Sequence, residues 1–225
     1  MQIIQPDDGG PIYAETNLSG IIAEPWNAIS SLAIVLPSIY WAIRLKGNVK
    51  QFAFLYFLIP LLFLGGTGSL LYHAFRNSRF LLWMDVVPTA IVTFAVSVYF
   101  WDRLLPKKWL VAVIIVPVTF MRFFLLDVLP GQLSVNVSYF ITGFLIFFPL
   151  LVYEVRNKMK YFKPIFISVI CLSASLAFRR LDHSFTWILP MGSHFLWHIF
   201  SGIGAYYLAL FIYLIRRDDL RTELP

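Results

Sequence analysis

The sequence predicts an all-α integral membrane protein that folds as one bundle of seven transmembrane helices. Hydrophobic residues make up 59% of its 225 residues and charged residues only 13%, whereas a soluble domain carries roughly 25% charged residues. The charged residues cluster in short stretches between apolar runs, and about 20 apolar residues are enough for a helix to cross a bilayer. Composition and pattern together therefore indicate a polytopic membrane protein.

Seven apolar runs reach this length. The predicted spans lie near 26–45, 52–73, 81–101, 109–126, 135–153, 162–180 and 194–215. Pro60, Pro88 and Pro117 fall within spans, which membrane helices tolerate because neighbouring groups satisfy the freed backbone. The fourth span ends where Arg122 and Asp127 enter the sequence. We expect every span to be helical.

The positive charges predict the direction of the chain. One set of loops holds thirteen Lys and Arg residues and the other set holds five. Because basic residues are enriched in cytoplasmic loops, we expect the N-terminus outside and the C-terminus in the cytoplasm, which requires an odd number of spans. The expected organisation is a single domain over 1–225, with an outer segment at 1–25 and a cytoplasmic tail at 216–225.

Charge and cysteine content exclude other classes. The net charge of +6 does not indicate a nucleic-acid partner, since the basic residues form no continuous face. The only cysteine, Cys171, lies in an apolar run, which excludes an internal disulfide and a cysteine-rich metal site. The first fifteen residues are acidic and polar, so we expect the first helix, rather than a signal peptide, to direct insertion.

Four polar residues stand where lipid-embedded helices should have none. His73, Asp85, His194 and His198 each lie in or at the end of a predicted span, and burying such groups in lipid costs several kcal/mol unless something compensates. In the predicted orientation all four fall at one depth, in the outer half of the membrane. The remaining histidine, His183, lies in a loop and is left out of the set.

A zinc ion would compensate these groups together. His194 and His198 are spaced i, i+4, so both rings project from one helix face. Three imidazoles with an open position form a common catalytic zinc site, which lowers the pKa of bound water toward about 7 and polarises a carbonyl. Asp85 would act as general base and then as general acid. Ser69, four residues before His73, would hydrogen-bond the water or the developing oxyanion.

Each residue also has a simpler interpretation. A lone histidine in a membrane helix often only hydrogen-bonds a neighbouring helix. Asp85 could cap the third span or pair with Arg76 or Arg79, and Ser69 could bond the carbonyl four residues before it. Asp182 could orient a ligand histidine from outside the ligand set or pair with a nearby arginine.

Several ordered motifs resemble those of the alkaline ceramidase family, whose relatives include the adiponectin and progestin receptors. The motifs are AEPWNAISSL at 23–32, GTGSLLYHAF at 66–75, MDVVP at 84–88, and FRRLDHSF followed by GSHFLWHIFSGIGAYY at 192–207. Each is weak alone, but the ordered set spans most of the chain. One departure bears on the substrate: the family's usual Asp-Glu-Leu-Pro reads Asp-Val-Val-Pro here.

The resemblance implies a zinc-dependent hydrolase of linear amide C–N bonds that cleaves ceramide to sphingosine and a fatty acid. It implies zinc on His73, His194 and His198, with Ser69 and Asp85 as catalytic partners. The expected partner is a membrane lipid, ceramide or another N-acyl lipid, that enters sideways from the outer leaflet. The predicted orientation puts the active site on the non-cytoplasmic side.

The resemblance further implies a calcium site before and at the first helix. The candidate ligands are Glu15, Asn17 and Glu24. Their hard oxygen donors suit calcium. The match is incomplete, since Ile12 stands where the family has an aspartate and the spacer before Glu24 is short, although Asp7 or Asp8 could substitute. Alternatively, these are solvated charges on an outer segment.

Two other classes of protein fit the same residues. A receptor-like seven-helix protein would use a structural zinc and bind a lipid ligand. A transporter or proton relay would use the histidines directly and would hold no stoichiometric metal. Release of free fatty acid and the metal content of purified protein separate the three classes.

Overall fold

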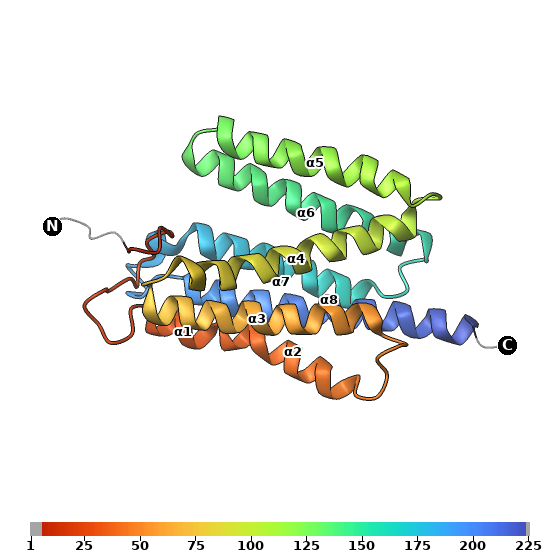
Figure 1. Ribbon diagram of the computed structural model, residues 1–225, viewed down its shortest axis with the longest axis horizontal. Coiled ribbons are helices and arrows are strands. Elements are labelled where there is room, and N and C mark those ends of the chain that lie inside the picture. Colours follow the sequence, from red (N-terminus) through yellow and green to blue (C-terminus); the bar gives the residue numbers. More distant parts are fainter. Residues whose placement is uncertain (1–5, 224–225) are drawn as a thin grey trace. The chain divides into compact units, whose positions relative to one another are not determined.

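The computed structural model describes residues 6–223, except for the side chains of residues 131, 132, 135, 136 and 223, and this part of the chain is built from helices (Figure 1). The elements are α1 Pro25–Ser30, α2 Leu32–Arg44, α3 Ala53–Phe75, α4 Arg79–Leu104, α5 Trp109–Val128, α6 Gly131–Arg156, α7 Phe162–Arg180, η1 Asp182–Phe185 and α8 His194–Glu223. Seven helical stretches, the first made of α1 and α2, are long and apolar enough to cross a membrane. The all-α class and the seven predicted spans are confirmed, and the orientation stays a prediction.

The first crossing consists of two helices where the sequence predicts one. Pro25 begins α1, at a position where a helix needs no N–H donor. At Ser31 the backbone N–H is shared between the carbonyls of Asn27 and Ala28, at 3.2 and 3.3 Å. The Ser31 hydroxyl also donates to the Asn27 carbonyl at 2.8 Å. Such bonding to the preceding turn weakens and bends helices, which explains the break.

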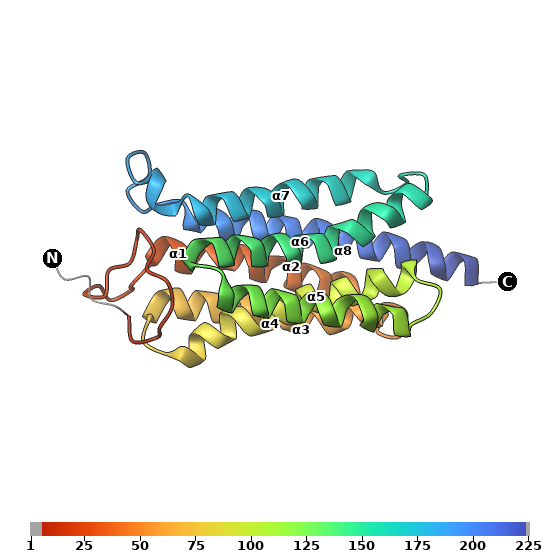
Figure 2. The same ribbon diagram turned by 90° about the horizontal axis from the view of Figure 1, so that it is seen from above.

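The described chain divides into two compact units. The first covers the residues up to Ala90 and those from Lys163 onward, and the second covers Ile91–Phe162, so that α4 belongs to both. Within the first unit α1 and α2 pack against both α3 and α8. The segment before α1 lies at the end of this unit where α3 ends and α4 and α8 begin (Figure 2). All candidate site residues belong to the first unit.

In the second unit a proline determines how α4 joins α6. Pro149 has no N–H, so the carbonyl of Leu145, four residues earlier in α6, lacks its helical partner. This carbonyl accepts hydrogen bonds from Ser97 Oγ and Trp101 Nε1, both at 3.0 Å. The two bonds satisfy a backbone group that lipid could not satisfy.

In the first unit, two glycines lie against backbone carbonyls that a proline four residues later leaves without a helical hydrogen bond. Pro88 frees the carbonyl of Met84 in α4, and a Cβ added to Gly68 of α3 would collide with that carbonyl. Gly202 of α8 lies equally close to the carbonyl of Ala33 in α2. That carbonyl also lacks its helical hydrogen bond, because Pro37 has no N–H. Small residues let membrane helices approach this closely, and the first contact brings α4 against α3 beside the candidate site.

Gly68→Ala is expected to destabilise the protein, because a methyl group has no room beside the Met84 carbonyl. Overpacking of this kind costs about 1–3 kcal/mol, so the melting temperature in detergent should fall by several degrees. The matched control is Gly143→Ala in α6, where the added Cβ would approach a Phe147 ring carbon at 4.0 Å. The control should be neutral or stabilising, since alanine favours a helix. Equal melting temperatures for Gly68→Ala and wild type would contradict the close contact.

Candidate metal centre

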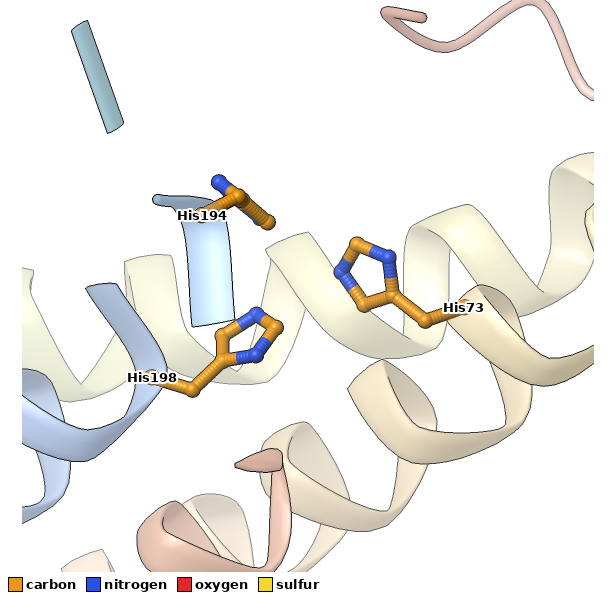
Figure 3. A group of neighbouring side chains, drawn as sticks. All are labelled: His73, His194 and His198. Atoms are coloured by element: carbon orange, nitrogen blue, oxygen red, sulfur yellow. The ribbon is translucent and has the colours of Figure 1, made fainter. Parts of the chain in front are cut away.

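Three histidines that are far apart in the sequence come together in the first unit. His73 lies in the last turn of α3, and His194 and His198 lie in the first two turns of α8. One ligand nitrogen from each ring lies within 4.8 Å of the others. All three side chains are buried, and Figure 3 shows their rings gathered around a common space. The geometry is that of a site able to hold one metal ion.

The ring of His73 is fixed by Glu24, the residue immediately before α1. The His73 Nδ1 atom lies 2.5 Å from Glu24 Oε2. Burial by itself would raise the pKa of Glu24, but the hydrogen bond with His73 and the charge of Arg76 outweigh it, so the pKa lies below its usual range. An ionised carboxylate only accepts hydrogen bonds, so Nδ1 carries the proton. In a neutral His73 ring the lone pair is then on Nε2.

The ring of His198 is fixed by serines of the first crossing. Its Nδ1 lies 2.8 Å from Ser30 Oγ and 3.4 Å from Ser31 Oγ. Both hydroxyls donate to the carbonyl of Asn27, at 3.0 and 2.8 Å, so their oxygens can accept a hydrogen bond from the N–H group at Nδ1. The lone pair of His198 is then on Nε2, which lies 3.5 Å from Ser69 Oγ. The hydrogen-bond network thus assigns the same tautomer as in His73.

The ring of His194 supplies the test of whether a metal fits. It stacks on Tyr13, with ring centroids 3.8 Å apart and an interplanar angle of 24°. Its Nδ1 atom is buried and has no hydrogen-bond partner among the described residues. An unsatisfied buried polar atom costs about 1–3 kcal/mol. Three imidazoles around one space, one of them with an unpartnered nitrogen, are the ligand chemistry that zinc prefers.

Asp182 of η1 holds the start of α8. Its Oδ1 accepts the backbone N–H groups of Ser193 and His194, and its Oδ2 accepts that of Ala14, each at 2.8 Å. A carboxylate at a helix N-terminus satisfies unpaired N–H groups and interacts favourably with the helix dipole. Asp182 therefore positions His194 through its backbone, whereas the sequence left open an orienting contact with a ring or an ion pair.

The structure also brings Ser69 and Asp85 together beside the histidines. Ser69, one turn before His73 in α3, is buried, and its Oγ lies 3.1 Å from Ser31 Oγ. Asp85 lies in the second turn of α4, with its side chain near His73 and within hydrogen-bonding reach of Ser69. Arg76, an alternative partner for Asp85, pairs with other carboxylates. A serine hydroxyl and a carboxylate thus lie next to the three imidazoles.

The candidate calcium ligands Glu15, Asn17 and Glu24 all bond protein groups. Glu15 accepts the backbone N–H groups of Trp26 and Asn27 at 2.6 and 2.9 Å, where it satisfies the first turn of α1. The Oδ1 atom of Asn17 accepts hydrogen bonds from the N–H and hydroxyl of Ser19, at 3.2 and 2.7 Å. Glu24 instead bonds His73 and an arginine. Because each of the three side chains already bonds protein groups, the structure gives the calcium prediction no support.

Sequence reasoning missed most of the side chains that support the three rings. The roles of Glu24, Tyr13, Ser30 and Ser31 depend on contacts between segments that are distant in sequence. One local signal was present in the sequence. Ser30 and Ser31 follow Asn27 by three and four residues, a spacing at which a serine hydroxyl can donate to the backbone carbonyl. That spacing predicts that the two hydroxyls donate to the Asn27 carbonyl, but it does not predict that His198 contacts their oxygens.

Seven apolar helical stretches of membrane-spanning length, with three buried histidines that could hold a metal ion, define a class of polytopic membrane protein. The particular family follows from comparison with known proteins: the Ceramidase family profile matches residues 14–224. The chain belongs to the ceramidase family, and its class of activity is that of an amide-cleaving hydrolase. The resemblance drawn from the motifs is thereby confirmed. No curated protein matches the chain in sequence.

Proposed function

We propose that this protein is a zinc-dependent membrane amidase that hydrolyses the N-acyl bond of ceramide or a similar lipid amide. The products are a long-chain amine base and a free fatty acid. The observation that carries the proposal is the meeting of His73, His194 and His198 around one buried space in a ceramidase-family chain. His73, His194 and His198 would hold the ion. When bound, zinc polarises a carbonyl and makes water more acidic.

The residues around the three rings prepare them to bind a cation. Glu24 and Ser30 hold the Nδ1 protons of His73 and His198, which leaves each Nε2 lone pair available. Partners of this kind orient a ligand ring and raise its basicity. Tyr13 stacks on the ring of His194 and thereby fixes the plane of that ring. The chain therefore orders the rings before any ion or substrate is present.

Asp85 and Ser69 carry the proton transfers and the charge stabilisation in this proposal. The Asp85 carboxylate takes a proton from the water that attacks the amide carbonyl, and it returns that proton to the nitrogen of the leaving amine. The Ser69 hydroxyl donates a hydrogen bond to the oxygen on which negative charge develops. Their mutual contact in the first unit supports this division of roles.

The location of the reaction is part of the proposal. The candidate site lies where the N-terminal segment meets the end of α3 and the start of α8 (Figure 1). With the distribution of Lys and Arg, this supports a site toward the non-cytoplasmic side. A lipid amide would enter from that leaflet with its chains among the helices. We propose that the two units work as one seven-helix domain.

The test combines metal content with a substrate screen. Protein purified in lipid nanodiscs should contain one zinc ion per chain and release free fatty acid from ceramide, an N-acylethanolamine or an N-acyl-homoserine lactone. Removal of zinc with a chelator should abolish the release, and added zinc should restore it. A zinc-loaded protein that cleaves none of these N-acyl lipids would contradict the proposed activity.

A further inference from the structure

Arg76 is a fully buried cation at the end of α3. It is the first residue after the helix, its exposed fraction is 1%, and its backbone is left-handed with φ of 49°. That conformation costs a non-glycine residue roughly 1 kcal/mol. Favourable interactions of the side chain must therefore compensate both the backbone strain and the cost of burying a positive charge.

Oxygen atoms of the N-terminal segment surround the guanidinium. Its Nε donates to Asp8 Oδ2 at 2.8 Å, and its Nη2 donates to Asp8 Oδ1 at 3.3 Å and to the Pro11 carbonyl at 2.9 Å. Its Nη1 donates to Glu24 Oε1 and, at 3.4 Å, to Thr16 Oγ1. The planar fork of an arginine suits such a set of directed acceptors. One side chain thus joins four residues that lie on both sides of the turn at 13–16.

Two aromatic rings complete the surroundings. The guanidinium carbon lies 4.8 Å from the ring centre of Tyr72 and 5.8 Å from that of Tyr13. A cation over an aromatic face is stabilised further when water is excluded. Burial would lower the pKa of Arg76, but its bonds to Asp8 and the charge of Glu24 raise that pKa above its ordinary value. The group therefore stays charged.

The contacts of the segment continue from Arg76 to the candidate metal centre. Glu24 gives one oxygen to Arg76 and the other to His73 Nδ1. Tyr13, beside Arg76, stacks on His194. Two of the three candidate ligands are therefore held by residues that Arg76 holds in turn, although Arg76 bonds neither ligand ring itself. Its role is that of a positioning residue.

The donor set around Arg76 is the kind that a divalent cation would attract. Two carboxylates, a carbonyl and a hydroxyl are hard oxygen ligands, and here they converge on a guanidinium. The candidate calcium ligand Glu24 is one of them. The chain thus supplies its own positive charge at the point where its N-terminal acidic residues need one.

We infer that Arg76 is a built-in cation that clamps residues 8–24 over the metal centre and orients His73 through Glu24. The inference rests on the metal site of the proposed function. It has two consequences: zinc affinity depends on Arg76, and neither zinc affinity nor stability requires calcium.

Zinc affinity measured by chelator competition, without lipid, tests the first consequence. Arg76→Met should lower the affinity by about 10- to 100-fold, as substitutions of partners outside the ligand set do. Arg76→Lys should lose less, because lysine restores the charge but not the planar fork. The control is Arg180→Met, which removes an exposed cation at the end of α7 and should leave the affinity unchanged. Folded Arg76→Met that binds zinc as tightly as wild type would overturn the inference.

A cobalt spectrum separates positioning from general stability. At full cobalt occupancy the visible absorption bands of Arg76→Met should differ from those of wild type, because His73 loses the orientation that Glu24 gives it. If Arg76→Met does not fold, Arg76→Lys and Asp8→Asn serve in its place, and both should weaken zinc binding. Wild-type affinity and wild-type cobalt bands in both of these variants would equally overturn the inference.

The calcium arm uses the wild-type protein alone. Zinc affinity and melting temperature should be the same in calcium-free buffer and in about 10 mM calcium, a concentration above the dissociation constants of roughly 0.1–1 mM of extracellular calcium sites. A rise of either quantity with calcium would refute the role of Arg76 as the resident cation. Zinc binding that depends on Arg76 in a protein without hydrolytic activity would reject the proposed reaction but keep this inference. A wild-type protein that binds no zinc would reject both.

Discussion

His198→Ala is expected to remove bound zinc and abolish hydrolysis of the lipid amide. The ring provides one of the three candidate ligands, so its removal would leave two imidazoles for the ion. Since substitution of outer partners alone costs about 10- to 100-fold in metal affinity, loss of a ligand should exceed that range. Zinc per chain and fatty acid release would be measured on the same sample.

The control for this prediction is His183→Ala. His183 is the exposed histidine outside the cluster, and its Nε2 lies 3.1 Å from the carbonyl of Ile12. It should keep zinc and activity. Turnover by His198→Ala protein that contains no zinc would reject a metal-dependent mechanism.

Asp85→Asn is expected to keep zinc and to lose most of the activity. The substitution preserves the shape of the side chain but removes the group that accepts and returns the proton. Loss of a general base costs about 10²- to 10⁴-fold in rate, and the loss should appear in kcat rather than in metal content. Asp102→Asn, an exposed position on the same helix, should behave as wild type.

This variant also separates the hydrolase from the receptor-like alternative. In a receptor with a structural zinc, the wild type would release no fatty acid, so Asp85→Asn could not lower that release. Undiminished release by Asp85→Asn would instead exclude Asp85 as the base, while leaving the metal site intact.

The membrane helices and the histidine cluster could be predicted from the sequence because both follow from local patterns. Apolar runs of about 20 residues determine spans, and the i, i+4 spacing places His194 and His198 on one face. His73 could be placed at the same depth because successive spans run in opposite directions, so the second span ends on the side of the membrane where the seventh begins. The break at Ser31 escaped prediction, because it depends on how a hydroxyl competes with the backbone of one particular turn.

The supporting contacts could not be predicted, because they join segments that are distant in sequence. Glu24 is an acidic residue before a helix, which from the sequence fits a calcium ligand as well as a solvated charge. Which cation reaches it is decided by the left-handed turn at Arg76. The orientation of the chain and the catalytic roles of Asp85 and Ser69 stay predictions.

The segment before the first helix has a practical consequence for anyone handling this protein. Residues between Asp8 and Glu24 reach the imidazole rings directly through Tyr13 and Glu24. A fusion partner or affinity tag joined close to Asp8 would disturb the contacts between this segment and the histidine rings, and removal of the residues before α1 would abolish them. Labels and capture tags for purification therefore belong at the carboxyl end, beyond α8.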